Sequence, residues 1–133
     1  MRAVKRPFLV NRIIPLVIAT AALYSCTLTT DPSRPATMEI VSGDVQTAPV
    51  NTALPDSLSV IVVGSFFEPI VNEPVVWSIV APGEGSLDPA TSQTNKDGLA
   101  WTRYTAGATA GAVKIQVRVS GLMSVFFDET VTP

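Results

Sequence analysis

The residue whose chemistry is easiest to predict is Cys26, the single cysteine of the 133-residue chain. A lone cysteine forms no intramolecular disulfide, so its thiol is either buried as a small apolar group or open to modification. Cys26 follows an apolar, uncharged run over residues 13–23, about half of the ~20 residues that a membrane-spanning helix needs. The run is preceded by a basic head that contains Arg2, Lys5, Arg6 and Arg12. This arrangement predicts a signal peptide over residues 1–25.

Beyond Cys26 the sequence offers little chemistry. It contains no histidine, which removes the commonest general base and the commonest ligand of transition metals. Glu84, Asp88 and Asp97 could supply oxygen ligands for calcium, but they lack the spacing of a calcium-binding loop. We expect them to be turn residues or solvated charges. No Gly-rich phosphate loop or serine nucleophile elbow occurs either, so we predict a protein that is not an enzyme and needs no metal or cofactor.

Charge excludes one class of partner. From Cys26 onward the chain has five basic residues against all 11 acidic ones, a net charge of about −6 before any lipid is added. Nucleic-acid binding depends on the neutralisation of phosphates by lysine and arginine, and no basic cluster occurs here. We therefore expect no nucleic acid among the partners.

From residue 36 onward, short apolar stretches alternate with polar residues and are separated by Pro, Gly, Asn and Asp. The clearest stretch, residues 113–120, has an apolar residue at every odd position, the period of a half-buried strand. Similar alternation marks residues 38–40, 58–63, 75–79 and 123–131. About seven short antiparallel strands in ~100 residues predict an all-β, immunoglobulin-like sandwich over residues 36–133. Residues 26–35 are rich in Thr, Ser and Pro and predict an extended tether.

The residues in front of Cys26 resemble the lipobox of bacterial lipoproteins. Leu23 stands three positions before the cysteine and the small Ser25 directly before it, although Tyr24 departs from the usual pattern. The resemblance implies that Cys26 is acylated on its sulfur, becomes the mature N-terminus and holds the protein to a membrane. Thr27 follows in place of an aspartate, which implies the bacterial outer membrane. An uncleaved signal anchor is the alternative, and it would leave the domain on the same side of the membrane.

A second resemblance covers residues 36–132. The segments that carry it are residues 43–55, 74–77, 83–87, 94–100 and 110–111. In their order and spacing they resemble the bacterial Ig-like domain, group 1, of the invasin and intimin type. Such domains act as stalks and spacers in adhesins, so the resemblance implies the fold and an adhesion-like setting. At residues 64–69, Phe67 replaces the turn glycine of the family, and we expect this loop to keep its course but lose its usual turn geometry.

Two groups of apolar residues are candidates for binding. The family pattern implies that the even-numbered residues around Trp101 point inward, which turns Trp101 outward. Ile61 and Val63 should face outward on the same sheet, and the three side chains would form an apolar patch of the kind that binds partners. A partly covered Trp101 is the alternative. Phe66 and Phe67 lie in a loop, where aromatic side chains dock a sugar, a protein or a membrane, unless one of them plugs the end of the sandwich.

These observations predict a non-catalytic lipoprotein of the bacterial cell envelope. Its Ig-like domain would serve as a binding or structural module that makes adhesion-like contacts with a protein or a glycan. The alternative is an accessory subunit that faces the periplasm and packs against an envelope complex. The expected partners are the membrane, through the lipid on Cys26, and one unidentified protein or glycan on either face of the outer membrane.

Overall fold

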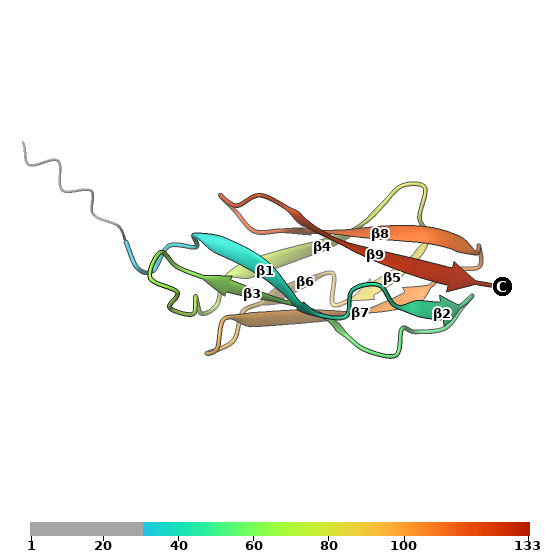
Figure 1. Ribbon diagram of the computed structural model, residues 1–133, viewed down its shortest axis with the longest axis horizontal. Helices are drawn as coiled ribbons and strands as arrows, with labels where there is room; N and C mark the ends of the chain where they lie inside the picture. Colours follow the sequence, from blue (N-terminus) through green and yellow to red (C-terminus); the bar gives the residue numbers. More distant parts are fainter. Residues whose placement is uncertain (1–30) are drawn as a thin grey trace, which may run out of the picture.

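The computed structural model describes residues 31–133, and the predicted signal peptide and Cys26 lie outside these residues. The described chain is built from strands joined by turns and loops (Figure 1). Its strands are β1 (Thr37–Ser42), β2 (Thr47–Pro49), β3 (Leu58–Val63), β4 (Pro74–Val80), β5 (Gly85–Asp88), β6 (Thr91–Gln93), β7 (Leu99–Ala106), β8 (Gly111–Arg118) and β9 (Val125–Thr132). Within residues 31–133, no helix is long and apolar enough to cross a membrane.

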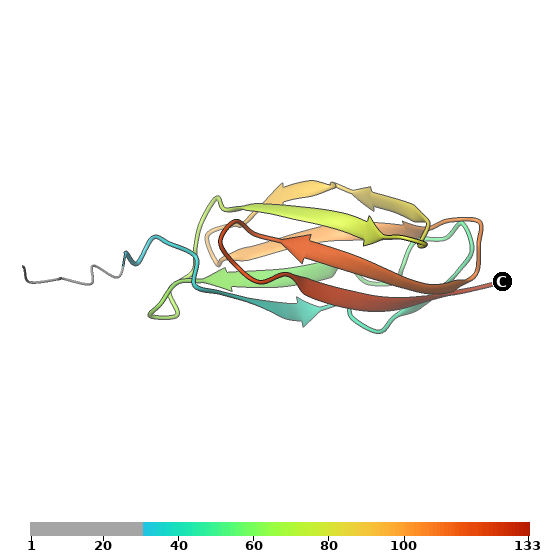
Figure 2. The same ribbon diagram turned by 90° about the horizontal axis from the view of Figure 1, so that it is seen from above.

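The nine strands form two sheets that pack face to face, as Figures 1 and 2 show. One sheet has the strand order β1-β3-β7-β5 and the other the order β2-β9-β8-β4-β6. The predicted all-β, immunoglobulin-like sandwich is confirmed, and the structure adds the three-residue strands β2 and β6. One pairing departs from the antiparallel prediction, because β2 runs parallel to β9.

Side chains from the inner faces of both sheets fill the space between them. In β3, the inward side chains are fully buried, as the alternation predicted: Leu58, Val60 and Val62. On the inner face of the β2-β9-β8-β4-β6 sheet, the ring centroid of Trp77 in β4 lies 6.0 Å from that of Phe127 in β9. The indole N–H of Trp77 donates to the Ser92 hydroxyl at 2.9 Å, so its polar atom is satisfied. Aromatic side chains bury the most area per residue and therefore dominate the stability of such a core.

Tyr104 in β7 ties the edge strand β5 to the core. Its side chain is fully buried, and its hydroxyl donates a hydrogen bond to the carbonyl oxygen of Glu84 at 2.5 Å. Burial and the neighbouring carboxylates of Glu129 and Glu84 raise the pKa of Tyr104, so the hydroxyl stays a donor at neutral pH. Gly85 permits this close approach. It has a φ of +130°, and a Cβ there would stand 2.6 Å from the tyrosine ring and overlap the Thr105 carbonyl oxygen.

The chain enters the sandwich beside the end of β3. The Ala36 N–H donates to the Val63 carbonyl oxygen at 2.9 Å, where the β1–β3 ladder begins. Just before it, the Arg34 N–H donates to the Asp31 carbonyl oxygen at 3.1 Å and closes a turn. The prediction of an extended tether is therefore wrong for residues 31–34, because this hydrogen-bonded turn shortens the path of the chain.

The loop after β3 keeps a tight turn. The Phe67 N–H donates to the Gly64 carbonyl oxygen at 3.1 Å, and the Gly64 N–H donates to the Glu68 carbonyl oxygen at 2.9 Å. Phe67 has a φ of +64°, in the left-handed region that favours glycine. The expected loss of turn geometry is therefore wrong, because Phe67 adopts the left-handed conformation itself. For a bulky side chain this conformation costs about 1–2 kcal/mol.

Several loops gather at the end where the chain enters, which we call the entry end (Figures 1 and 2). Besides residues 31–36, it comprises residues 64–73, which join β3 to β4, and residues 95–98, which precede β7. Residues 119–124, between β8 and β9, lie at the same end because Arg118 pairs with Val76 near the start of β4. Residue 133 lies at the opposite end of the sandwich (Figure 1).

A substitution of Gly85 tests the attachment of β5. Gly85→Ala forces a Cβ into the Tyr104 ring and the Thr105 backbone, whereas Gly111→Ala, at a φ of +144°, meets no atom within 4 Å. We expect Gly111→Ala to lower the free energy of unfolding by about 1–2 kcal/mol through backbone strain alone. Gly85→Ala should cost roughly 2 kcal/mol more, because overpacking adds to the strain. Urea denaturation measures the free energy of unfolding of both variants. An equal loss in the two would show that the structure around Tyr104 accommodates the added Cβ without cost.

Candidate functional site

Trp101 stands on the outer face of the β1-β3-β7-β5 sheet. Its neighbours along β7, Ala100 and Thr102, are buried, which turns the indole outward and leaves Trp101 51% exposed. The strand register places it directly opposite Ser59 of β3, and a side chain as small as serine leaves that side of the ring uncovered. Trp101 thus points outward, as the family pattern implied, whereas its role in binding stays a prediction.

Apolar side chains adjoin Trp101 on one side of this face. Leu99 is the next outward residue of β7, and the register places Ile61 of β3 opposite Leu99. Val41 of β1 is exposed and borders the same groove as Leu99 and Trp101. Val63 is half-buried and lies farther along β3, away from the indole. We call the cluster of Val41, Ile61, Leu99 and Trp101 the Trp101 face. The predicted patch lacked Val41 and Leu99, although the alternation along β1 places Val41 outward.

Polar side chains form the rim of the Trp101 face. On one side, Asp56 borders an open groove of about 680 Å³ that also touches Trp101. In the same groove, the hydroxyl groups of Ser42 and Ser59 share a hydrogen bond of 2.7 Å. On the other side of the indole, Arg103 borders a second groove. An apolar centre with a polar rim that carries charges of both signs is the usual composition of a protein interface.

Phe66 and Phe67 do not belong to the Trp101 face. They lie at the tip of the loop formed by residues 64–73, where they are 70% and 82% exposed. Neither side chain plugs the end of the sandwich, so that interpretation is wrong. Trp101 pairs with Ser59, which lies roughly 15 Å along β3 from the start of this loop. The structure therefore divides the predicted patch into two surfaces, one on a sheet and one at the entry end.

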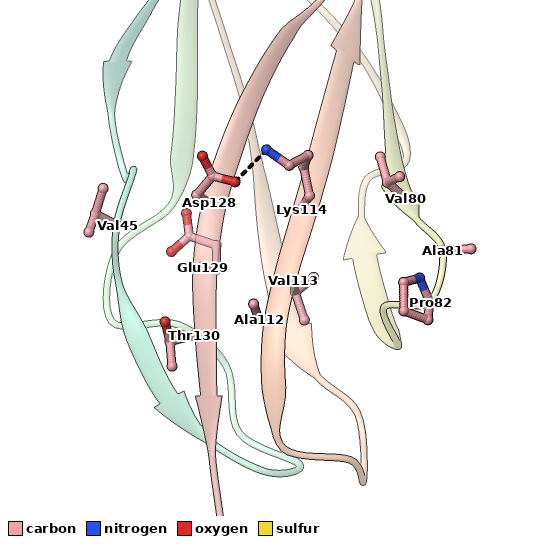
Figure 3. Close-up of a pocket in the computed structure, with 10 residues that line it drawn as sticks. All are labelled: Val45, Val80, Ala81, Pro82, Ala112, Val113, Lys114, Asp128, Glu129 and Thr130. Carbon is pink, nitrogen blue, oxygen red and sulfur yellow. Dashed lines mark ion pairs between the residues drawn. The ribbon is translucent and has the colours of Figure 1, made fainter.

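A third groove, of about 410 Å³, crosses the outer face of β8 and β9 and borders a buried carboxyl group (Figure 3). Glu129 is only 2% exposed because it points inward in alternation with Phe127. Its Oε2 accepts a hydrogen bond from the Gln46 N–H at 2.6 Å, and its Oε1 has no partner within residues 31–133. Burial raises the pKa of Glu129 to about 7, opposed by the Gln46 hydrogen bond and reinforced by the carboxylates of Asp44 and Asp128.

The groove beside Glu129 has its exposed charges already paired. Lys114 of β8 and Asp128 of β9 form an ion pair of 2.7 Å in its middle, with Val45 on one side and Pro82 on the other (Figure 3). Glu129 therefore acts chiefly on the stability of the fold. The sequence pattern did not single out Glu129. Every second residue of this strand points inward, however, and Glu129 follows the inward Phe127 by two positions.

The acidic residues considered as calcium ligands belong to separate elements. Glu84 precedes β5, Asp88 ends that strand, and Asp97 lies in the turn before β7. Within residues 31–133, no group of three or more His, Cys, Asp or Glu side chains is arranged to hold a metal ion. Cys26 lies outside the described residues, so its lipidation stays a prediction.

Glu129→Gln should remove a pH dependence of stability. The pKa of Glu129 rises from an ordinary value of 4.5 to about 7 on folding, so its ionisation opposes the folded state. The stability that this group contributes is complete below about pH 4.5 and is lost as the pH rises through about 7. We expect the free energy of unfolding, measured in urea, to fall by roughly 2 kcal/mol between about pH 5 and about pH 8 through Glu129.

Asp128→Asn is the matched control, because Asp128 is an exposed acid next to Glu129 on the same strand. This variant should keep most of the fall in stability, whereas Glu129→Gln should abolish it. A pH profile that is the same for Glu129→Gln and for the unaltered chain would contradict the assignment.

Comparisons with known proteins find similarity in structure alone. No protein-family model matches the chain, and no curated protein matches its sequence. The chain is similar to a 282-residue C-terminal fragment of intimin, solved in complex with the intimin-binding domain of the translocated intimin receptor. The TM-score is 0.57 at 22% identity, over 74% of this chain and 33% of that fragment. The adhesin InvE of Yersinia pseudotuberculosis gives a TM-score of 0.60 at 12% identity, over 74% of this chain and 32% of the other.

A third similar structure, the D0-D1 domain of intimin, gives a TM-score of 0.53 at 22% identity. It is matched over 76% of this chain and 49% of its own length, so the chain spans about a third to a half of these proteins. At such identities the similarity establishes the fold, as the resemblance in sequence implied. The described chain is therefore a single immunoglobulin-like sandwich of the type found in intimin and invasin-like adhesins.

Proposed function

We propose that the chain is a non-catalytic lipoprotein of the bacterial cell envelope, anchored through Cys26. Its Ig-like domain binds a partner protein through the Trp101 face. The basic head, the short apolar run and the residues before Cys26 support export and acylation. Thr27 after the cysteine supports the outer membrane as the destination.

The observation that carries the binding role is the half-exposed indole of Trp101, which adjoins the apolar side chains of the Trp101 face. Tryptophan is enriched among the residues that dominate protein interfaces, because it buries a large and rigid surface on contact. Trp101 belongs to β7, whose residues 99–102 pair with β3 and whose residues 103–106 pair with β5. The indole is therefore presented by a rigid strand, and binding does not require a loop to become ordered first.

The neighbours of Trp101 favour a protein over a glycan. Val41, Ile61 and Leu99 extend the apolar surface on one side of the indole, and polar residues stand at its border, which is the usual composition of a protein interface. The intimin fragment that this fold resembles was solved with a protein domain of its receptor. This supports a protein partner for this chain, although each fold carries many functions.

Cys26→Ser tests the anchor. The substitution removes the sulfur that is acylated, so we expect the protein to leave the membrane fraction or to accumulate as an unprocessed precursor. Cell fractionation and the mass of the mature N-terminus measure both effects. Normal processing with full membrane retention would contradict the lipid anchor. Protease treatment of intact cells then assigns the face: digestion of the domain places it outside, and protection supports an accessory subunit in the periplasm.

Trp101→Ser tests the binding face. Loss of a central tryptophan should weaken the partner's binding by about tenfold or more, a typical effect for a dominant interface residue. The isolated domain first captures the partner from cell envelopes, and the affinity of the purified pair is then compared between variants. Phe126→Ser is the matched control, because Phe126 is an exposed aromatic residue on the other sheet.

We expect Phe126→Ser to bind normally and Trp101→Ser to keep the thermal stability of the unaltered domain. Equal affinities for the two variants would exclude the Trp101 face as the interface. Unfolding of Trp101→Ser would identify the indole as part of the core and would exclude the interface as well.

A further inference from the structure

Exposed apolar side chains concentrate at the entry end. Of the eight exposed large hydrophobic residues within residues 31–133, four lie in the loops formed by residues 64–73 and 119–124. They are Phe66, Phe67, Val71 and Met123, and Met123 is 90% exposed. Both loops lie at the end where the chain enters (Figures 1 and 2). Of the other four, Val41, Trp101 and Phe126 lie on strands, and Val45 lies between β1 and β2, where it borders a groove with Pro82. The loops that hold exposed apolar side chains are therefore concentrated at the entry end.

The tip of the loop after β3 is held in one conformation. The Glu68 carboxylate accepts a hydrogen bond from the Phe66 N–H at 2.8 Å and lies against Gly64, where a Cβ would overlap it. Phe67 is held at a φ of +64° with its ring in solvent. A strained, exposed aromatic residue does nothing for the core, so its presence points to a contact outside the domain.

The same loop touches the incoming chain. A Cβ on Gly64 would come within 2.8 Å of the Pro32 carbonyl oxygen, so the two backbones are in contact. Five residues lie between Cys26 and Pro32, so the Cα atoms of these two residues are at most about 22 Å apart even when the chain is fully extended. The acylated sulfur would therefore stand within about 22 Å of the base of the loop, whatever path the residues between them take.

Electrostatic attraction is not the main contribution to binding at the entry end. Lys96 and Asp97 lie 3.6 Å apart in the turn before β7. Glu73 and Arg118 carry opposite charges and border one groove near the start of β4, and the Glu68 carboxylate accepts the hydrogen bond of the Phe66 N–H. Apolar side chains are therefore the main source of affinity at the entry end, and salt should affect that affinity little.

We propose that the tip formed by Phe66 and Phe67, with Val71 and Met123, inserts into the interfacial region of the bilayer that anchors the chain. This inference rests on the proposed anchor near Cys26, and it adds that the domain docks on the membrane surface. Aromatic side chains favour the membrane interface. A few apolar residues bind a bilayer weakly by themselves, but the covalent anchor makes their insertion an intramolecular event.

The single cysteine permits a test that does not depend on acylation in cells. Every buried core residue lies between Met38 and Val131, so residues 26–133 carry the complete core. This fragment can be coupled through the Cys26 thiol to a maleimide lipid in phosphatidylcholine vesicles with brominated acyl chains. Phe67→Trp in a Trp101→Phe background serves as the reporter, since the remaining Trp77 is buried. Ala110→Trp in the same background is the control, because Ala110 is exposed at the opposite end.

We expect bromine to quench the Phe67→Trp reporter at least threefold more than the Ala110→Trp reporter, with little change when salt is added. Phe66→Ser, added to the reporter, should reduce this quenching by more than half. Equal quenching of the two reporters, with coupling confirmed by flotation, would overturn the proposal. If Phe67→Trp fails to fold, Met123→Trp is the reporter and the same outcomes apply. Membrane retention of Cys26→Ser in cells would contradict the proposed lipid anchor but would not change the vesicle result. Failure of the anchor and failure of the docking on the membrane are therefore distinguishable.

Discussion

The packing of large side chains between two sheets is the constraint on which everything else in this domain depends. A single cysteine excludes an intramolecular disulfide, so the core must hold the sheets together alone. Trp77 and Phe127 lie near each other on the inner face of one sheet, and the buried Tyr104 belongs to the facing sheet, where it links the core to the edge strand β5. Because side chains alternate between the two faces of a strand, the neighbours of every residue that is buried in the core point outward. The position of Trp101 is thus a consequence of the burial beside it.

The sequence predicted the features that follow from the two-residue alternation of side chains along a strand. The inward face of β3 follows from its alternation, whereas the outward position of Trp101 in β7 was implied by the family resemblance. Two features did not follow. The parallel pairing of β2 with β9 involves three residues, too few to show a period. The location of Phe66 and Phe67 depends on which strand ends meet in space, and local sequence does not encode that. Glu129 had the right period, but a charged residue is rarely expected inside.

The two candidate surfaces differ in origin and direction. The Trp101 face is built from paired strands and runs along the length of the sandwich, whereas the aromatic tip is built from a loop at the entry end (Figure 1). With the entry end on a membrane, the strands stand away from the bilayer and the Trp101 face looks sideways. A partner that binds there approaches parallel to the membrane. The two surfaces then do not compete, because the bilayer covers one and leaves the other free.

The parallel pairing of β2 with β9 has a mechanical consequence. The Val50 N–H donates to the Thr132 carbonyl oxygen at 2.8 Å, and the Thr130 N–H donates to the Gln46 carbonyl oxygen at 2.9 Å. Residues 31 and 133 lie at opposite ends, so a pull between them draws β2 toward one end and β9 toward the other (Figure 1). Such a load stretches the bonds between the two strands together, in shear, so they must fail as a group. The short strand β2 therefore acts as a clamp against tension along the chain.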